Sequence, residues 1–315
     1  MDYKLTDEQC EIVVQNASRL LYEYCQKYNI HYVITGISGG LDSAVTIALA
    51  MKARRLAAKH DYNLVPIGLI MPCESDSQAE YLAKKVAKKF YVQTLKVDLT
   101  GTFKFLFTNQ FKMLNARVYD LIGEMGKPGD YCDDFEQAKK IAQGNIKARL
   151  RMITVYHVAR LLNGLVLSTD NLSELWMGFW TICGDVGDYG MIQNMLKGSE
   201  LYDLARYLEV PEEIIAAKPD DGLGVANGDE DQLGASYPVI DEIMLRQIQK
   251  GLDPDGEVKP QKEYLVNTPP IQGVDPKTIT SITRRALSNS FKRKGTINLT
   301  REELGLTPLK EIDLK

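Results

Sequence analysis

The chain has 315 residues, of which 44% are hydrophobic and 25% are charged, and its formal net charge is −4 at pH 7. These values are typical of a soluble globular protein with one large or two small domains, and the acidic balance argues against a nucleic-acid partner bound through a basic surface. No apolar run approaches the ~20 residues of a membrane-spanning helix, the polar N-terminus lacks a signal-peptide core, and five scattered cysteines without a C-x-x-C pair favour reduced thiols, so we expect a cytoplasmic protein with no membrane partner.

Extended and helical patterns alternate along the first half of the chain. Residues 6–9 predict the start of a helix, and an apolar run at 32–37 predicts the first strand. Strands alternating with helices indicate an α/β fold with a parallel sheet, whose crossover connections are right-handed. The other predicted strands are 64–70, 92–97 and 165–168, the helices between them are 44–59, 77–89 and 136–162, and residues 101–134 predict a helix followed by a loop at 126–129.

The character of the chain changes after residue 198. A short helix is predicted at 201–208 and a longer one at 237–250. Between them, residues 220–231 combine five carboxylates with several glycines and show no periodicity. Composition alone predicts a surface loop without fixed structure here. A mobile lid over an active site, covering about residues 218–232, is the functional alternative.

The most informative stretch follows the first predicted strand. Residues 38–43 read Ser-Gly-Gly-Leu-Asp-Ser, and an alanine-rich helical segment comes next. Small residues let the backbone approach a ligand closely, and free N–H groups at a helix start bind anions with the help of the helix dipole. This context predicts a phosphate-binding loop. The alternative is a tight turn in which Asp42 is only a partner of the helix dipole.

The side chains of this loop predict a metal as well as a phosphate. The loop lacks the Gly-Lys-Ser/Thr ending of a Walker motif and the G-x-G-x-x-G pattern of a dinucleotide-binding turn. It carries instead the carboxylate of Asp42, which would repel a phosphate unless a cation lay between them. Magnesium is commonly held by one or two carboxylates together with phosphate oxygens. The loop therefore predicts a complex of a nucleotide with Mg²⁺.

The segment after the fourth predicted strand offers a second metal ligand. In open α/β sheets, ligands bind at the carboxyl ends of the strands, where the strand order reverses. If the fourth strand neighbours the first, residues 168–179 face the phosphate loop, and Asp170 or Asn171 caps the helix that follows. Glu174 lies one turn into that helix, where a carboxylate is by default a dipole partner. Opposite Asp42 it becomes a candidate magnesium ligand.

The long predicted helix carries a polar stripe. Asn145, Arg149 and Tyr156 are spaced so that they fall within one narrow sector of the helix. Such a stripe is usually a solvated face. Arginine with asparagine and tyrosine can equally clamp a phosphate, and position alone does not separate these two interpretations.

Several of these segments resemble one known family. Ser-Gly-Gly-x-Asp-Ser after a strand resembles the loop of the ATP pyrophosphatase (PP-loop) superfamily, whose members cleave ATP to AMP and pyrophosphate. Together with other segments in the expected order, it makes the chain similar to the NAD synthetases over most of residues 10–295. The matching segments are 36–43, 144–152, 168–189, 229–234 followed by Tyr237 and Asp241, and 290–293.

This resemblance implies a Rossmann-like, doubly wound α/β fold with a parallel five-stranded sheet and flanking helices, as in the adenine nucleotide alpha hydrolases. Residues 1–315 would form a single domain with a helical and extended C-terminal segment from about residue 237. In the implied reaction, ATP adenylates the nicotinate carboxylate of deamido-NAD (nicotinate adenine dinucleotide), and ammonia then displaces AMP to give NAD. Mg²⁺, ATP as co-substrate and a homodimer with the substrate site at its interface are implied as well.

The resemblance also implies roles for individual residues. Lys197 would contact a phosphate, and Asp185 and Asp188 would lie near the nicotinate end, where ammonium is held and deprotonated. Asp185 and Lys197 are the implied catalytic residues, and Asp42 and Glu174 are the implied metal ligands. ATP would meet Gly36, Ile37, Ser38, Gly39, Gly40, Leu41, Asp42, Ser43, Thr169, Lys197 and Asp220, with adenine near residues 71–77, and deamido-NAD would meet Tyr24, Asn145, Arg149, Tyr156, Asp185, Asp188, Phe291 and Lys292.

Three positions depart from the family pattern. Ile182-Cys183 replaces a Lys-Tyr pair common in the small bacterial enzymes, the spacing from Asp185 to Asp188 is one residue shorter, and Asp220 stands where the family often has threonine. The sequence of residues 171–175 resembles that of the glutamine-dependent enzymes, which carry an amidase domain before the phosphate loop. Only 35 residues precede Gly36, so we expect no glutaminase domain and ammonia that is free or supplied by a separate partner.

Two other functions are compatible with a PP-loop-like sequence. Another adenylating PP-loop enzyme, such as a tRNA-modifying thiolase or lysidine-type ligase, would favour a basic surface, and the thiolases often carry cysteine pairs. The net charge of −4 and the lack of C-x-x-C argue against both. A non-catalytic nucleotide sensor is the third interpretation, against which the presence of Asp42, Glu174 and Lys197 together argues.

Overall fold

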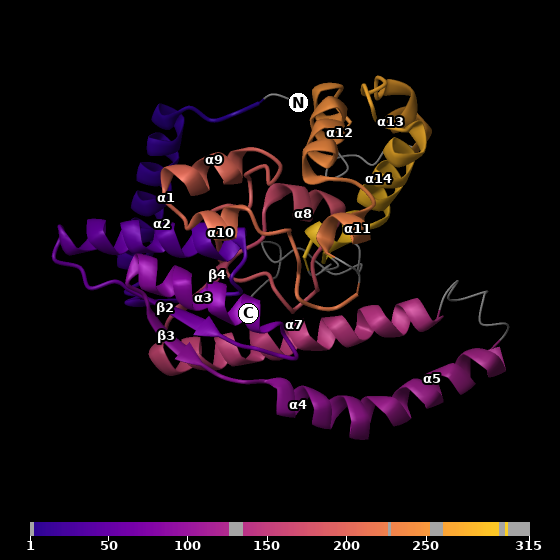
Figure 1. The fold of residues 1–315 in the computed structure, drawn as a ribbon, viewed down its shortest axis with the longest axis horizontal. Helices are drawn as coiled ribbons and strands as arrows, with labels where there is room; N and C mark the ends of the chain where they lie inside the picture. Colours follow the sequence, from indigo (N-terminus) through magenta and orange to yellow (C-terminus); the bar gives the residue numbers. More distant parts are fainter. Residues whose placement is uncertain (1–2, 126–134, 226–227, 253–260, 296–299, 302–315) are drawn as a thin grey trace, which may run out of the picture.

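A computed structural model describes residues 3–125, 135–225, 228–252, 261–295 and 300–301. Helices and strands alternate up to β3, four described helical elements then lead to β4, and the described elements after β5 are helices (Figure 1). The elements in chain order are α1 (Asp7–Lys27), β1 (Tyr32–Gly36), α2 (Leu41–Ala58), β2 (Val65–Ile70), α3 (Ser77–Phe90), β3 (Gln93–Lys96), α4 (Thr100–Phe105), the π-helical segment η1 (Leu106–Phe111), α5 (Lys112–Met125), α7 (Phe135–Leu162), β4 (Leu165–Ser168), α8 (Leu172–Met177), β5 (Tyr189–Gly190), α9 (Glu200–Tyr207), α10 (Glu212–Ile215), α11 (Asp229–Leu233), α12 (Tyr237–Gln249), α13 (Gln261–Asn267), α14 (Pro276–Ser288) and α15 (Ser290–Arg293).

The described strands form one parallel sheet in the order β3-β2-β1-β4-β5. The chain moves outward from β1 to β3 and then returns to place β4 beside β1, with Val33 opposite Leu165. The strand order therefore reverses between β1 and β4. This is the arrangement on which the sequence argument for Glu174 depends, and the predicted doubly wound five-stranded fold is confirmed.

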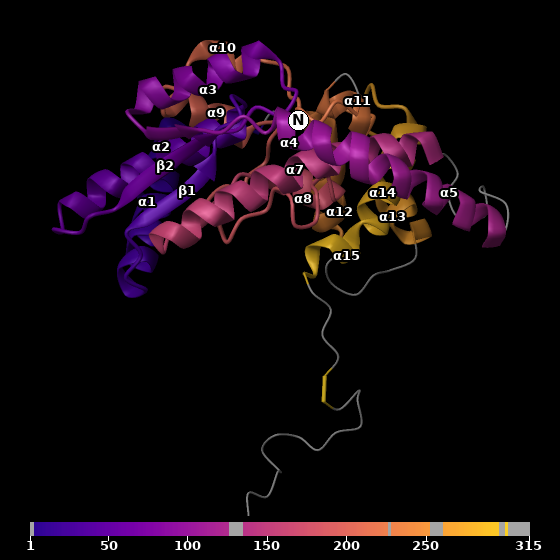
Figure 2. The same ribbon diagram turned by 90° about the horizontal axis from the view of Figure 1, so that it is seen from below.

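Side chains alternate across the sheet because successive residues of a strand point to opposite faces. On β1, Val33 packs with α1 and α2, whereas the next residue, Ile34, packs with the α7 residue Val155. Figure 2 shows α7 on one side of the sheet and α3, α9 and α10 on the other. A third apolar cluster joins α8 to α12 and α14 around Trp176 and Ile240. These C-terminal helices thus have a core of their own, anchored to the sheet through α8.

The predicted elements are confirmed with small shifts at their ends. The capping box at the start of α1 is present, because Thr6 Oγ1 accepts from Gln9 N and Gln9 Oε1 accepts from Thr6 N. The loop predicted at 126–129 lies outside the described residues. Sequence patterns did not predict β5, of two residues, or the helices α10, α13, α14 and α15. The helix α11 overlaps the end of the acidic stretch 220–231, so the prediction of a loop without fixed structure is wrong there.

The described ranges include four of the five cysteines. All four are free thiols, three of them buried and Cys183 exposed. None of the helices in these ranges has both the length and the apolar character that a bilayer-spanning segment requires.

Candidate active site

The loop between β1 and α2 is fixed by its own hydroxyl groups. Ser43 Oγ lies 3.1 Å from Ser38 Oγ and donates to Gly40 O at 3.0 Å, while Gly40 N donates to Ser38 Oγ at 3.2 Å. Gly39 has a φ of +90°, and a Cβ there would lie 2.5 Å from Ala79 O. Only glycine fits this position, because other residues disfavour that φ and α3 fills the space.

The loop presents backbone groups at the start of α2. Gly40 is the N-cap of α2 and no side chain caps the helix, so its first N–H groups and the positive end of its dipole are available to an anion. The side chains of Ile37 and Leu41 are buried in the core. Of these two residues, only the backbone can therefore contribute to a nucleotide site.

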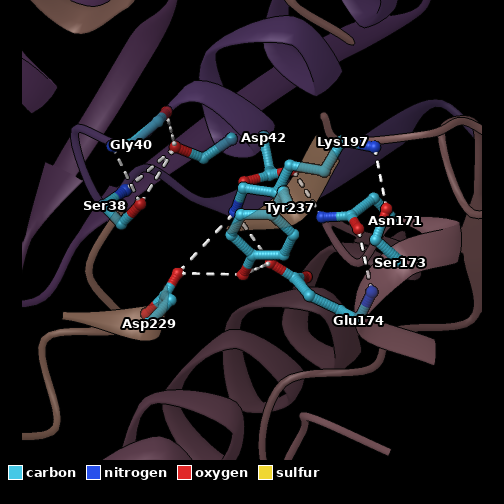
Figure 3. Close-up of polar contacts among 10 residues, drawn as sticks. Ser38, Gly40, Asp42, Asn171, Ser173, Glu174, Lys197, Asp229 and Tyr237 are labelled. Carbon is cyan, nitrogen blue, oxygen red and sulfur yellow. Dashed lines mark hydrogen bonds and ion pairs between the residues drawn. The ribbon is translucent and has the colours of Figure 1, made fainter. Parts of the chain in front are cut away.

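Asn171 connects this loop to the start of α8. As the N-cap of α8 it accepts a hydrogen bond from Glu174 N through Oδ1 at 3.0 Å. Its Nδ2 donates to Asp42 Oδ1 at 2.9 Å. The amide thus links the loop after β1 to the segment after β4 and brings Asp42 and Glu174, which are distant in sequence, to one point (Figure 3).

Lys197 lies at that point. Its Nζ is 2.9 Å from Asp42 Oδ2 and 2.8 Å from Glu174 Oε1, and it is 3.8 Å from Asp229 Oδ2. The ammonium also lies 4.6 Å from the centroid of the Tyr237 ring. The Tyr237 hydroxyl is 3.2 Å from both Glu174 Oε1 and Asp229 Oδ2, so it can donate a hydrogen bond to either carboxylate (Figure 3).

The backbone beside this cluster is fixed from α12. Ser173 Oγ accepts from Lys197 N at 2.9 Å and donates to Asp241 Oδ1. Gly198 N donates to Asp241 Oδ2 at 2.8 Å. Burial raises the pKa of Asp241 to about 6, and the two donors oppose that rise. The main chain at Lys197 is therefore held from both sides.

The cluster carries more acid than base. Burial raises the pKa of Glu174 to about 7 and that of Asp229 to about 6, against the pull of the Lys197 ammonium. Burial alone would lower the pKa of Lys197, but Asp42 and Glu174 outweigh it and hold that pKa well above its ordinary value. The buried Oδ1 of Asp229 has no hydrogen-bond partner among the described residues. This excess of carboxylate oxygen suits a further cation.

The polar stripe of α7 contacts the segment between α8 and β5. Thr181 Oγ1 donates to Asn145 Oδ1 at 2.7 Å, Arg149 Nε donates to Ile182 O at 3.2 Å, and Tyr156 OH donates to Asp188 Oδ1 at 2.6 Å. The three predicted residues of α7 are thus brought against residues 181–188, although Arg149 and Tyr156 are also exposed to solvent.

Asp185 and Lys292 lie at the same end of the site. Thr181 N donates to both oxygens of Asp185, at 2.9 and 3.1 Å. Burial raises the pKa of Asp185 to about 6, while this N–H and the nearby Lys292 lower it. Lys292 donates to the carbonyls of Gly178 and Trp180, which ties α15 to the end of α8.

The remaining predicted residues lie around these two groups. Thr169 is half-buried between β4 and α8, and the Phe291 side chain is 53% exposed. The Tyr24 ring lies 5.1 Å from the Tyr189 ring. Asp220 is exposed, and its Oδ1 accepts from Gly222 N at 2.7 Å. One of its carboxylate oxygens lies within 4.8 Å of one from Asp221 and one from Asp229, which places Asp220 at the edge of the Lys197 cluster.

Sequence reasoning assigned no role to Asp229, Tyr237, Ser173 or Asp241. Asp229, Tyr237 and Asp241 belong to the stretch that resembles the family after the acidic loop, and the resemblance implies no individual role for them. Their contribution depends on α11 and α12 folding back onto α8. A five-residue helix such as α11 gives too short a pattern to be recognised from hydrophobic spacing.

Comparisons with known proteins agree on one family. The sequence profile described as NAD synthase matches residues 13–296. The NH(3)-dependent NAD(+) synthetase of Methanocaldococcus jannaschii is 32% identical over 253 residues, which cover 80% of this chain and 86% of that protein. That of Methanosarcina mazei is 29% identical over 89% of this chain and 96% of that protein.

Solved structures show the same fold. The NMN synthetase of Francisella tularensis superposes with a TM-score of 0.65 at 23% identity, covering 92% of this chain and 98% of that one. The NH3-dependent NAD synthetase of Campylobacter jejuni superposes with a TM-score of 0.61, also at 23% identity, covering 92% and 99%.

Proposed function

The chain belongs to the NAD synthase family, and from this membership and the site we propose that it catalyses the ATP-dependent amidation of deamido-NAD by ammonia to NAD. The carrying observation is that the segments resembling the family, 36–43, 144–152 and 168–189, meet at the carboxyl edge of β1 and β4. A nucleotide loop, a carboxylate cluster and a polar helix face thereby line one site.

Two displacements make up the proposed reaction. A nicotinate carboxylate oxygen attacks the α-phosphorus of ATP, and pyrophosphate leaves. Ammonia then attacks the acyl carbon, AMP leaves with the former carboxylate oxygen, and the nitrogen loses a proton. We assign the N–H groups of the loop and Lys197 to the pyrophosphate, and Asp185 to the ammonium and its proton.

The residues present fit a magnesium ion. Asp42 Oδ2 and Glu174 Oε1 both face one cation, the Lys197 ammonium, at 2.9 and 2.8 Å, and oxygen ligands are those that Mg²⁺ prefers. We assign Mg²⁺ to Asp42 and Glu174, where it neutralises charge that develops on the phosphates. Asn171 orients the Asp42 carboxylate for this role, and the Tyr237 hydroxyl orients that of Glu174.

The remaining assignments rest on the family. We propose that Thr169 and Asp220 meet ATP, and that Tyr24, Asn145, Arg149, Tyr156, Asp188, Phe291 and Lys292 meet deamido-NAD. We further propose one domain, with residues 218–232 as a mobile loop, and a cytoplasmic location.

The first experiment is a substrate comparison. Purified protein with ATP, Mg²⁺, ammonium and deamido-NAD is expected to form NAD, AMP and pyrophosphate in equal amounts, measured by chromatography and a coupled pyrophosphate assay. Glutamine is expected to be a poor nitrogen donor, and nicotinate mononucleotide a poor acceptor. Release of AMP that requires tRNA, or no release with any acceptor, would contradict the proposal.

The pH dependence tests Asp185. Because burial holds its pKa at about 6, this carboxyl is protonated below that pH and charged above it. We expect kcat/KM for ammonium to fall as pH drops through about 6. Asp185→Asn is expected to lower kcat/KM by about 10²-fold and to abolish this fall in kcat/KM near pH 6. Because ammonium titrates in the same way in both proteins, the difference between the pH profiles of wild type and variant isolates Asp185. If kcat/KM of the variant still fell as pH drops through about 6, Asp185 would be excluded as the base.

A homodimer is proposed from exposed apolar groups beside the substrate face. Ile153 lies on the same face of α7 as Arg149 and Tyr156, and its side chain is 66% exposed. Ile153→Glu is expected to convert the dimer to a monomer in light scattering. The matched control Val266→Glu, at a side chain 73% exposed on α13, is expected to stay dimeric. A monomeric wild-type protein would refute the assembly.

A further inference from the structure

Lys197 contacts the two carboxylates that the proposed function assigns to magnesium. Its Nζ lies within 2.9 Å of Asp42 Oδ2 and within 2.8 Å of Glu174 Oε1. Both are direct, charge-assisted hydrogen bonds. The side chain is buried and its backbone is fixed through Ser173. An ammonium thus already neutralises the oxygens that a metal ion would use.

We propose that Lys197 and a divalent cation compete for Asp42 and Glu174, so that the metal binds tightly only when Lys197 has turned to another anion. This inference rests on the proposed function for the metal ligands. The reason is electrostatic, because two cations on the same two oxygens would lie a few ångströms apart in a buried site where charge repulsion is poorly screened.

The cluster also offers Lys197 a second place. Asp229 Oδ2 is 3.8 Å from Nζ, and the face of the Tyr237 ring is 4.6 Å away. The carboxylate of Asp42, in the phosphate loop, acts electrostatically on both groups. A small rotation of the side chain therefore keeps the ammonium paired with Asp229 while Asp42 and Glu174 are released. The phosphates of ATP would complete this second position, which couples binding of the metal to binding of the nucleotide.

Direct metal binding tests the competition without any turnover. Mn²⁺ is titrated into chelator-treated protein without nucleotide, and free Mn²⁺ is followed by electron paramagnetic resonance. Wild type is expected to bind weakly, and Lys197→Met is expected to bind at least about tenfold more tightly because the competing charge is gone. The double variant Asp42→Asn, Lys197→Met is expected to bind weakly again.

Lys89→Met is the matched control. It removes a lysine in the last turn of α3 that pairs with Glu209 at 2.8 Å, and its Mn²⁺ affinity is expected to stay within about twofold of wild type. Circular dichroism checks that each variant is folded. Should Lys197→Met fail that check, Lys197→Gln replaces it, which keeps a hydrogen-bond donor without the charge.

Equal Mn²⁺ affinity in wild type and the Lys197 variant would overturn the competition. Tight binding that survives in the double variant would overturn it as well, because the metal would then not use Asp42. Neither result depends on catalysis. Failure of the wild type to form NAD would count against the proposed function alone.

Discussion

Asp42→Asn is expected to lower kcat/KM for ATP by about 10³-fold, equivalent to about 4 kcal/mol of transition-state stabilisation. Asparagine keeps the shape of the side chain, and its oxygen can still accept from Asn171, which now donates to Asp42 Oδ1 at 2.9 Å. The lost element is one negative charge beside the proposed metal and Lys197. The measurement is the rate of AMP release at varied concentrations of ATP and Mg²⁺. Saturating Mg²⁺ is expected not to restore the wild-type rate.

The control for this variant is Asp275→Asn. Asp275 is an exposed N-cap that accepts from Lys277 N at 2.8 Å on α14, and asparagine caps helices about as well as aspartate. Its rate is expected to equal that of wild type. Undiminished activity and an unchanged Mg²⁺ requirement in Asp42→Asn would show that the metal is held elsewhere.

Gly39→Ala is expected to destabilise the protein by about 2–4 kcal/mol and to abolish measurable ATP binding. The reason is geometric, since the φ of +90° disfavours any Cβ and the new atom would lie 2.5 Å from the backbone oxygen of Ala79. Either the loop moves away from the start of α2 or α3 shifts. Both changes displace the N–H groups that would hold the phosphates. Urea unfolding and calorimetric titration with ATP measure the two effects.

Gly101→Ala is the matched control for that substitution. Gly101 lies in α4, and an added Cβ there would meet nothing within 4 Å. Because alanine favours a helix, the variant is expected to be as stable as wild type or more stable by about 0.5–1 kcal/mol. If Gly39→Ala bound ATP with wild-type affinity, the phosphate loop would have to be assigned elsewhere.

The sequence predicted the elements whose pattern is local. The strands β1, β2 and β4 and the helices α2, α3 and α7 each carry enough apolar residues to be predicted from the chain. β3 has four exposed residues and a single apolar one, and it was predicted only through the wider run 92–97. The phosphate loop was also readable, because its glycines and hydroxyls act within six consecutive residues, 38–43. The prediction that Glu174 lies opposite Asp42 needed one added assumption, that the fourth strand neighbours the first. The strand order of the sheet confirms this assumption.

The helical pattern of α1 shows how a local signal can mislead about burial. Ile12 and Leu20 support the helix by their spacing, yet both side chains are about half exposed, while Cys10 and Cys25 are buried. Which face of a helix is covered depends on the neighbours it packs against. Spacing alone therefore predicts the helix and not its surroundings.

By itself, the sequence determined the alternation of strands and helices, the nucleotide loop and the resemblance to one family, because each depends on residues that are close in the chain or on motifs in a fixed order. The tertiary structure alone decided that Lys197 lies between Asp42 and Glu174, with Tyr237 and Asp229 around it. These residues span nearly 200 positions. Their contacts arise when α8, α11 and α12 pack together, and the energy of such contacts depends on burial and distance, which no local pattern carries.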